Sequence, residues 1–200
     1  MASNSRRSAL IVGAALCSLV FLAVTGCIMI AGSFPGDRGL LIELHEVVGT
    51  STDEPMIAIG DATDTLPLVG IAVVVAAVLL LAGRRLDALF LLLGLGVACA
   101  LNPVFKEIVE RARPDIRAIP VSVSQYSFPS GHAANTAALV GGLSMIVRPE
   151  RRRLAVAVGG LVLAVVAFSQ LALGVHYPSD LVAGWLWVGA FTTLLWSTRA

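Results

Sequence analysis

The sequence predicts an all-α integral membrane protein, a bundle of six transmembrane helices with an amphipathic helical segment on its outer face. Of its 200 residues, 57% are hydrophobic and 14% are charged, whereas soluble domains carry about 25% charged residues. The mean hydropathy is +0.88. Six apolar runs approach or exceed the roughly 20 residues that a helix needs to cross a bilayer. Backbone polar groups cannot stay unpaired in lipid, so these runs are expected to be helical.

The six runs divide one membrane-embedded domain, residues 1–200, into three parts. The first part is a transmembrane helix over residues 9–31 (Ala9–Ala31), and an outer interfacial segment over residues 32–65 follows it. The third part, residues 66–197, contains the five remaining runs: Leu66–Ala82, Leu86–Phe105, His132–Val147, Leu154–Leu173 and Leu181–Trp196. Six glycines within these runs are expected to let the helices pack closely: Gly94, Gly96, Gly141, Gly142, Gly159 and Gly160.

The interfacial segment combines acidic residues with a helical pattern. Its apolar residues recur at helical spacing over Leu40–Val48, so this stretch is expected to lie along the outer membrane surface. Ser51–Glu54 resembles a capping box that opens a second short helix.

Two interpretations of the first run stay open. Arg6 and Arg7, an apolar stretch and then Val24–Cys27 are typical of a bacterial lipoprotein signal that ends at Cys27. Alternatively, the run is an uncleaved transmembrane helix, because Ile28–Ala31 continues it. We expect the uncleaved helix. Both interpretations leave three short polar patches outside, namely Lys106–Pro114, Pro129–His132 and Ser169–Asp180.

Arginine placement predicts the orientation. Nine of the fourteen basic residues fall at the N-terminus, in alternate loops and at the C-terminus, and eleven of the thirteen acids fall on the other side. The positive-inside rule then puts both termini of a multi-pass cell membrane protein in the cytoplasm. Three short polar patches lie on the opposite side, so the active site is expected to be extracytoplasmic.

Composition also argues against some classes of function. The net charge of +1 does not suggest nucleic acid binding. The cysteines Cys17, Cys27 and Cys99 lie in apolar runs without metal-ligand spacing. Neither a disulfide framework nor a zinc site is therefore expected.

The first polar patch, Lys106–Pro114, contains the only lysine of the chain. Lys106 and Arg113 are seven residues apart, about two helical turns, so both can face one side of a helix that Pro114 ends. A guanidinium fork and a mobile ammonium complement each other as phosphate ligands. The alternative is that both are membrane-flanking cations that reach toward lipid headgroups.

The second patch, Pro129–His132, opens the fourth run. A glycine before a helix lets the backbone approach a ligand, and the N–H groups at a helix start bind anions. Ser130 adds a hydroxyl, Gly131 an accessible N–H, and His132 is able to donate a proton near neutral pH. The alternative is an ordinary helix start with Ser130 as its cap.

The third patch, Ser169–Asp180, opens the last run. A carboxylate four residues after a histidine is able to bind one ring nitrogen and orient the other as a nucleophile, which suits His176 and Asp180. The alternative is that Asp180 only caps its own helix. The third histidine, His45, has no such patch around it and is interpreted as a surface residue.

Taken together, the three patches resemble the signature of the type 2 phosphatidic acid phosphatase family, the lipid phosphate phosphatases. That signature is K-x6-RP, then PSGH, then SR-x5-H-x3-D. Lys106 with Arg113-Pro114 and Pro129–His132 match in full, and Ser169, His176 and Asp180 match the third part, with Gln170 in place of its arginine. The resemblance covers the chain from about Leu66 to the C-terminus. Soluble vanadium haloperoxidases share this kind of pocket, but the apolar runs argue against them.

The resemblance implies a mechanism. His176 attacks phosphorus and forms a phosphohistidine, Asp180 orients His176, and His132 protonates the leaving oxygen and then helps to activate water. The phosphate oxygens are held by the other motif residues, Lys106, Arg113, Ser130 and Gly131, with Gln170 beside them. No metal and no cofactor are needed.

The implied substrate is a lipid-linked phosphate or diphosphate, of polyprenyl or phosphatidyl type, whose tail stays in the bilayer. A non-catalytic or weakened relative that binds lipid phosphates, and a lipid phosphotransferase, are the alternatives. The headgroup, the tail and the oligomeric state stay open.

Gln170 leaves three interpretations open, because an amide donates a hydrogen bond but carries no charge. In the first, Arg111 or Arg117 supplies the missing cation. In the second, the substrate headgroup carries less charge or offers a polar group that Gln170 binds. In the third, the protein is a weakened or inactive relative that binds lipid phosphates. A charge-assisted hydrogen bond contributes about 1.5–3 kcal/mol, against about 1 kcal/mol for a neutral one.

Overall fold

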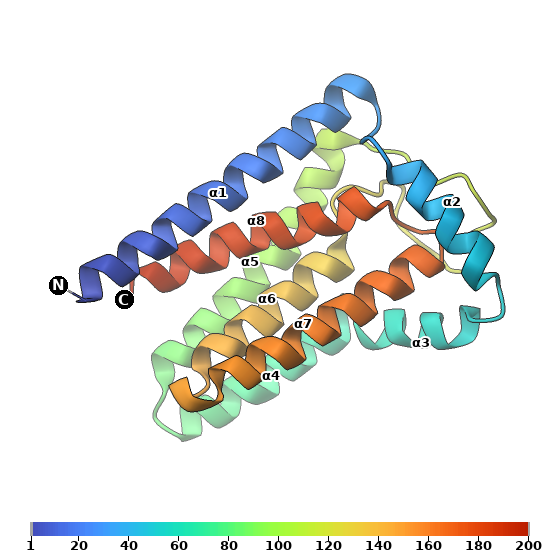
Figure 1. Cartoon of the computed structure of the whole chain (residues 1–200). Coiled ribbons are helices and arrows are strands. Elements are labelled where there is room, and N and C mark those ends of the chain that lie inside the picture. The colour runs from blue at the N-terminus through green and yellow to red at the C-terminus, as the bar shows by residue number, and fades with distance from the viewer. Residues whose placement is uncertain (1, 200) are drawn as a thin grey trace.

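The chain folds into helices throughout. The computed structural model describes residues 2–199, with side chains from residue 7 onward, and this part of the chain contains eight α-helices and no strand (Figure 1). The all-α prediction is therefore confirmed. The helices are α1 (Ala2–Ala31), α2 (Asp37–Val48), α3 (Asp53–Ala62), α4 (Thr65–Leu81), α5 (Arg85–Val109), α6 (Gly131–Ile146), α7 (Pro149–Ala172) and α8 (Pro178–Ser197).

Three of these helices are long and apolar enough to cross a membrane. They contain the segments Arg7–Ala31, Arg85–Val109 and Pro149–Ala172, and a fourth span results if α3 and α4, bent by 44° at their junction, count as one broken span. α6 has 16 residues and is about 24 Å long, less than the roughly 30 Å of a bilayer core. The described part of the chain thus contains three or four helical segments able to cross a membrane, and the count of six spans stays a prediction.

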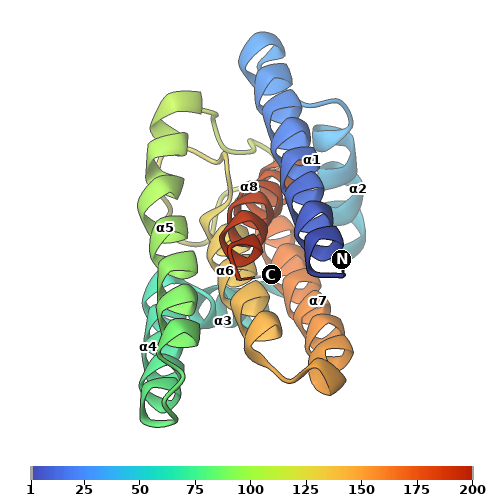
Figure 2. The same cartoon turned by 90° about the vertical axis from the view of Figure 1, so that its left-hand side faces the viewer.

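Helices α1 and α8 lie side by side, with both chain ends at the same end of the bundle (Figures 1 and 2). The buried side of α1 carries Phe21, Val24 and Ile28, three to four residues apart as on one helix face. Its other side exposes Leu16, Leu19 and Leu22, each by more than half. Such exposed apolar side chains suit contact with lipid rather than with water. The helix runs unbroken through Cys27.

Helix α6 lies in the middle of the bundle and packs against α4, α5, α7 and α8. Small residues make this possible: a Cβ carbon at Gly142 would stand 2.8 Å from Leu91, and one at Gly184 of α8 would stand 2.9 Å from the carbonyl oxygen of Ser130. Close packing was predicted at Gly142 but not at Gly184. Three other glycines for which close packing was predicted face open space instead: Gly96, Gly141 and Gly160.

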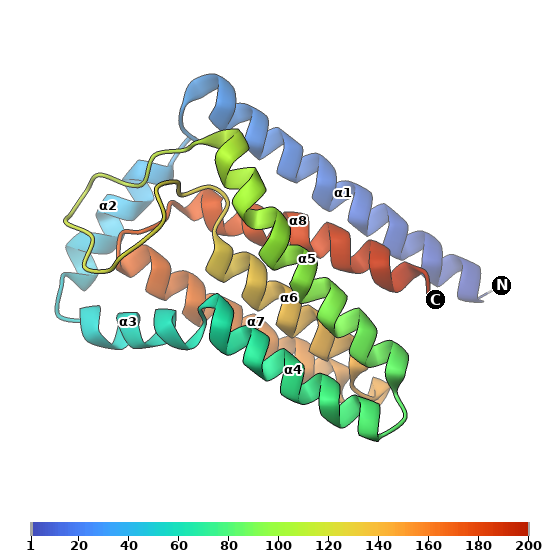
Figure 3. The same cartoon turned by 180° about the vertical axis from the view of Figure 1, so that it is seen from behind.

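Helices α2 and α3 cover the end of the bundle opposite the chain termini, where the long loop between α5 and α6 also lies (Figure 3). Both helices form where the sequence predicted them. The predicted capping box is wrong, however, because the residue before α3 is Thr52 and its side chain makes no capping hydrogen bond. α2 packs on α7 and α8, and α3 packs on α7, so the outer segment is docked on the bundle. All three polar patches meet at this end.

Candidate active site

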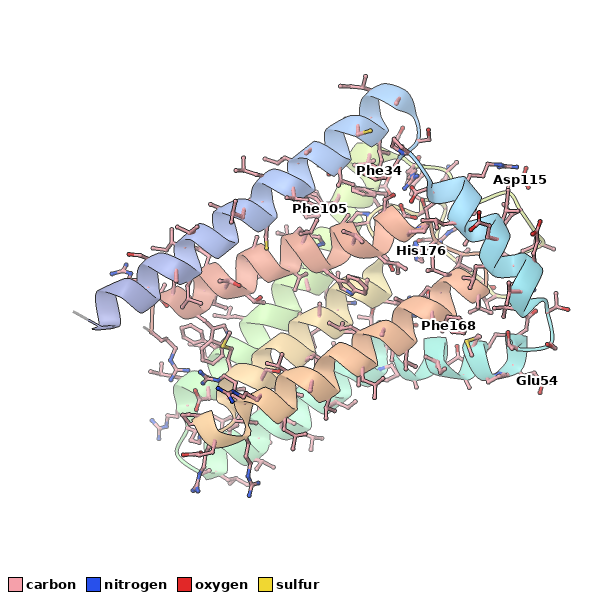
Figure 4. The ribbon with its side chains drawn as sticks, viewed as in Figure 1. Phe34, Glu54, Phe105, Asp115, Phe168 and His176 are labelled. Atoms are coloured by element: carbon pink, nitrogen blue, oxygen red, sulfur yellow. The ribbon has the colours of Figure 1, made fainter. Side chains whose placement is uncertain are left out.

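A cavity of about 410 Å³ opens at the end of the bundle that α2, α3 and the long loop cover. It is hereafter called the polar cavity, and Figure 4 shows His176 at this end. Six residues that the sequence predicted for a phosphate site line it: Lys106, Arg113, Gly131, His132, Gln170 and His176. Folding therefore gathers all three patches around one space.

The end of α5 places Lys106 of the first patch. Lys106 lies in the last turn of α5, and its Nζ donates to the carbonyl oxygen of Tyr126 at 2.6 Å. The helix ends at Val109, and Glu110 takes a positive φ of 49° that turns the chain away. The predicted helical register between Lys106 and Arg113 is therefore wrong, although both residues reach the cavity.

Arg113 reaches the polar cavity from the loop that follows α5. Its Nη1 donates to the carbonyl oxygen of Val175 at 2.5 Å, and its Nε donates to the carbonyl oxygen of Ser124 at 2.7 Å. Burial lowers the pKa of the Arg113 guanidinium, and the negative charge of Asp180 opposes this shift. An arginine has so high a pKa that the group stays cationic. Arg113 is thus a fixed positive charge beside His176.

The start of α6 supplies the second patch. Ser130 is the N-cap residue: its Oγ accepts a hydrogen bond from the Ala133 N–H at 3.4 Å, and the side chain is fully buried. Ser130 is not among the residues that line the polar cavity, whereas Gly131 and His132 are. The Nε2 atom of His132 lies 3.2 Å from the carbonyl oxygen of Gly60. The structure thus gives Ser130 the capping geometry of the alternative interpretation.

His176 and Asp180 flank the start of α8. The Nδ1 atom of His176 lies 3.5 Å from Oδ2 of Asp180, which is longer than a well-formed hydrogen bond. The same Oδ2 accepts a hydrogen bond from the backbone N–H of Tyr177 at 2.8 Å. Asp180 therefore caps α8 and faces His176 at once, so the two interpretations of this carboxylate are compatible.

The electrostatic surroundings favour a neutral His176. Burial lowers its pKa to about 4, and the opposing effect of the Asp180 carboxylate is smaller. At neutral pH the imidazole therefore carries no charge, and one ring nitrogen keeps the lone pair that nucleophilic attack requires. Gly174, with φ of 69°, makes the turn between α7 and α8 that presents this ring.

Gln170 occupies the position of the missing arginine and lines the polar cavity. Its Nε2 atom donates to the neighbouring Ser169 Oγ at 3.4 Å, and both residues are buried. Ser169 itself donates to the carbonyl oxygen of Val166 at 2.8 Å. Gln170 thus presents an uncharged donor to the cavity.

The structure places neither Arg111 nor Arg117 among the residues that line the polar cavity. Arg111 is buried and forms ion pairs with Asp37 at 2.7 Å and with Asp180 at 2.5 Å. Arg117 pairs with Asp53 at 2.5 Å. Arg111 is held by Asp37 and Asp180, and Arg117 is held by Asp53, so neither guanidinium fills the place of the missing arginine.

Three residues around the site were missed by the sequence analysis. Asn102 and Asn135 line the polar cavity, and polar residues inside apolar runs are a signal that would have found them. Asp37 carried no such signal, because it lies in an acidic segment without a motif. Within residues 2–199, no cluster of three or more His, Cys, Asp or Glu side chains is arranged to hold a metal ion.

Comparison with known proteins shows which family the chain resembles. The family model of the PAP2 superfamily matches residues 87–200. Phosphatidylglycerophosphatase B of Bacillus subtilis is 30% identical over 132 residues, 63% of each chain. Decaprenylphosphoryl-5-phosphoribose phosphatase of Mycobacterium tuberculosis is 38% identical over 107 residues, 50% of this chain and 55% of that protein. The match therefore spans less than two thirds of either relative.

Solved structures share the fold. A PAP2-type phosphatidylglycerolphosphate phosphatase from Bacillus subtilis superposes with a TM-score of 0.74 at 24% identity, covering 93% of this chain and 94% of that one. LpxE of Aquifex aeolicus superposes with a TM-score of 0.64 at 19% identity, covering 84% of this chain and 98% of that one.

The family match covers more than half of the chain, including all three motifs. It confirms the family that the residues Lys106–Pro114, Pro129–His132 and Ser169–Asp180 resemble. The chain belongs to the PAP2 superfamily.

Proposed function

We propose that the protein is a membrane lipid phosphatase that hydrolyses a lipid-linked phosphate or diphosphate through a phosphohistidine intermediate. The observation that carries the proposal is the meeting of two cations, Lys106 and Arg113, with His132 and the buried neutral His176 around one cavity. Related proteins point to the same chemistry, since their names state phosphatase activity on phosphatidylglycerol phosphate or on a decaprenyl-linked phosphoribose. A third relative is an undecaprenyl-diphosphatase of Sulfolobus acidocaldarius.

In the first chemical step, Nε2 of His176 forms a bond to phosphorus while the bond from phosphorus to the ester oxygen breaks. His132 gives its proton to the leaving oxygen. Asp180, on the Nδ1 side of His176, stabilises the positive ring that forms. In the second step water attacks phosphorus, His132 takes the proton of that water, and the phosphorus–nitrogen bond breaks.

Lys106, Arg113 and the Gly131 N–H hold the phosphate oxygens in this mechanism. Cations and backbone donors that are fixed before the reaction stabilise the charge that develops on those oxygens. Gln170 contributes a neutral donor at the same cavity. These groups supply the charge neutralisation that phosphoryl transfer needs without a metal ion.

The same proposal extends to the membrane. In it, six helical segments span the bilayer and the polar cavity lies at the extracytoplasmic face. The arginines Arg84 and Arg199 lie at the end that carries the chain termini, opposite the cavity, which fits the positive-inside rule. The tail of the substrate stays in the bilayer while its headgroup enters the cavity.

Phosphate release by the purified protein in detergent tests the proposal. The panel comprises phosphatidic acid, phosphatidylglycerol phosphate, a polyprenyl monophosphate and a polyprenyl diphosphate, each with wild type and His176→Ala. Wild type is expected to release phosphate from at least one of them, and the variant from none. Binding of lipid phosphate without release would instead favour the non-catalytic alternative, for which the missing arginine at Gln170 is the specific observation.

A further inference from the structure

Arg111 forms the centre of a buried cluster on the far side of the catalytic carboxylate from the polar cavity. The cluster, hereafter the Arg111 network, consists of Asp37, Arg111, Ser179 and Asp180, all of which are buried. Nη1 of Arg111 donates to Oδ1 of Asp180 at 2.5 Å and to Oγ of Ser179 at 2.7 Å. Nη2 donates to Oδ2 of Asp37 at 2.7 Å.

Asp37 completes the network from α2. Its Oδ1 accepts from the backbone N–H of Ser179 at 3.0 Å, and its Oδ2 accepts from the Ser179 hydroxyl at 2.5 Å. The guanidinium of Arg111 also lies 4.2 Å from the centre of the Tyr177 ring. The side chain of Arg111 is therefore held through both of its terminal nitrogens and by the Tyr177 ring.

We infer that Arg111, fixed by Asp37, is a positioning residue for the proposed nucleophile and acts on His176 through Asp180. By binding Oδ1 of Asp180, Arg111 leaves Oδ2 as the oxygen that faces His176. The inference rests on the proposed function, because it assumes that His176 is the nucleophile.

Charge gives the network its chemical consequence. A fully buried carboxylate is costly unless it is paired, so Arg111 keeps Asp180 ionised beside His176. Two carboxylates share one guanidinium, which leaves the network with a net negative charge next to the imidazole. Such a charge stabilises the positive ring that forms when His176 attacks phosphorus. Removing Arg111 takes a positive charge from the pair of Asp180 and His176 and makes the pair easier to protonate.

Other charged groups face the same pair. Lys106 from α5 and Arg113 from the loop contribute positive charge on the cavity side, and His132 of α6 lines the same cavity. These groups stay in place when Arg111 or Asp37 is changed. A shift in the pH profile of such a variant therefore reports on the Arg111 network.

The test measures kcat and kcat/KM for phosphate release from a lipid phosphate of the panel that wild type hydrolyses. It covers pH 4.5 to 8.5 and compares wild type, Arg111→Lys, Arg111→Met and Asp37→Asn. Rates are divided by the number of inorganic phosphate sites per chain, measured by calorimetry, so that inactive molecules do not count. We expect Arg111→Met to lower kcat about 10- to 100-fold, the loss typical of one charge-assisted hydrogen bond. The acid limb of the pH–rate profile of Arg111→Met is expected to move to higher pH. Its KM and its affinity for inorganic phosphate are expected to change less than about threefold, because Arg111 does not line the cavity.

Arg111→Lys keeps the charge but cannot hold both carboxylates as a planar fork does, so its shift is expected to be smaller and in the same direction. Asp37→Asn removes a negative charge, so its acid limb is not expected to move to higher pH. Arg117→Lys is the matched control: Arg117 also pairs with a carboxylate of the outer segment, Asp53, but has no contact with Asp180. Its profile is expected to superpose on that of wild type.

Two results would overturn the inference. One is a set of profiles for both Arg111 variants that superpose on wild type after correction for phosphate sites. The other is an upward shift in Asp37→Asn equal to that of the Arg111 variants, which would indicate general loosening. If Arg111→Met does not fold, Arg111→Lys and Asp37→Asn still decide the question. Failure of the proposed function looks different, because wild type itself would then release no phosphate.

Discussion

Gln170 of α7 packs against Gly60 of α3, so that a Cβ carbon at Gly60 would stand 3.4 Å from Nε2 of Gln170. The carbonyl oxygen of the same Gly60 lies 3.2 Å from Nε2 of His132. One turn of α3 thus contacts both the proposed general acid and the residue that departs from the family signature. The outer segment therefore takes part in shaping the surroundings of the polar cavity.

Gln170→Arg is expected to tighten the binding of inorganic phosphate about tenfold, because a charge-assisted hydrogen bond replaces a neutral one. The measurement is the inhibition constant of phosphate in the hydrolysis assay. If the missing charge limits catalysis, hydrolysis of every lipid phosphate in the panel rises. If Gln170 instead binds a headgroup, the substitution lowers the rate for that headgroup alone.

Gln170→Glu is the matched control, since it has nearly the same size and the opposite charge. It is expected to weaken phosphate binding by at least the same factor. Equal changes in phosphate binding for the arginine and glutamate substitutions would contradict the position of Gln170 beside the phosphate. A steric disturbance would affect both variants alike, whereas a charge next to the phosphate would act in opposite directions.

His176→Gln is expected to lower kcat by about 10⁴-fold or more, as for the loss of a nucleophile elsewhere. His45→Gln is the histidine control: its ring lies on α2, where Nδ1 is 3.0 Å from the carbonyl oxygen of Leu41, and it does not line the cavity. The control is expected to keep its rate within about threefold. Brief reaction with ³²P-labelled substrate is expected to give an acid-labile label on wild type and none on His176→Gln.

Gly184→Ala is expected to reduce both stability and activity. The added carbon would stand 2.9 Å from the carbonyl oxygen of Ser130 and 3.1 Å from the N–H nitrogen of Ala134, so the start of α6 must shift. Overpacking of this kind costs about 1–3 kcal/mol, and the shift displaces Gly131 and His132. Thermal unfolding in detergent and the rate assay measure the two effects.

Gly189→Ala on the same helix is its control. A carbon added at Gly189 meets nothing within 4 Å, and alanine is favoured over glycine in a helix by about 1 kcal/mol. Its melting temperature is expected to be unchanged or higher. Equal losses in the two variants would argue against the close approach of α8 to α6.

Sequence patterns were sufficient to predict the helical class, the position of α2 and six residues of the polar cavity. These features follow from apolar periodicity and from short motifs, which are local. The register of Lys106 and Arg113 was wrong because α5 ends at Val109, four residues before Arg113. The positive φ of Glu110 that accompanies this ending is unusual for a residue other than glycine and has no clear sequence signal.

The ion-pair partners of Arg111 and Arg117 could not be predicted from the sequence. Each pairs with an aspartate more than 60 residues away in the chain, Asp37 and Asp53. Docking of the outer segment on the bundle creates these pairs, and no local pattern in a single amino-acid sequence marks such contacts. The same docking buries Asp37, which a solvated acidic segment would have left exposed.

Acid is expected to destabilise the protein through His176. Burial lowers the pKa of its imidazole from 6.5 to about 4 in the folded chain. Between these two pH values the unfolded chain binds the proton and the folded chain does not, so the free energy of unfolding falls as the pH falls through this window. The free energy of unfolding is about 3 kcal/mol lower once the pH is below both pKa values. Above pH 6.5 both states are neutral, and the group has no effect on stability.

Thermal unfolding of wild type and His176→Gln in detergent, compared from pH 4 to pH 7.5, measures this effect. All other titrating groups are shared by the two proteins, so their contributions largely cancel in the difference. Stability of wild type relative to the variant is expected to be constant above pH 6.5 and to decrease steadily toward pH 4. Parallel curves over the whole range would mean that His176 titrates alike in both states, and the ring would then not be held neutral by burial.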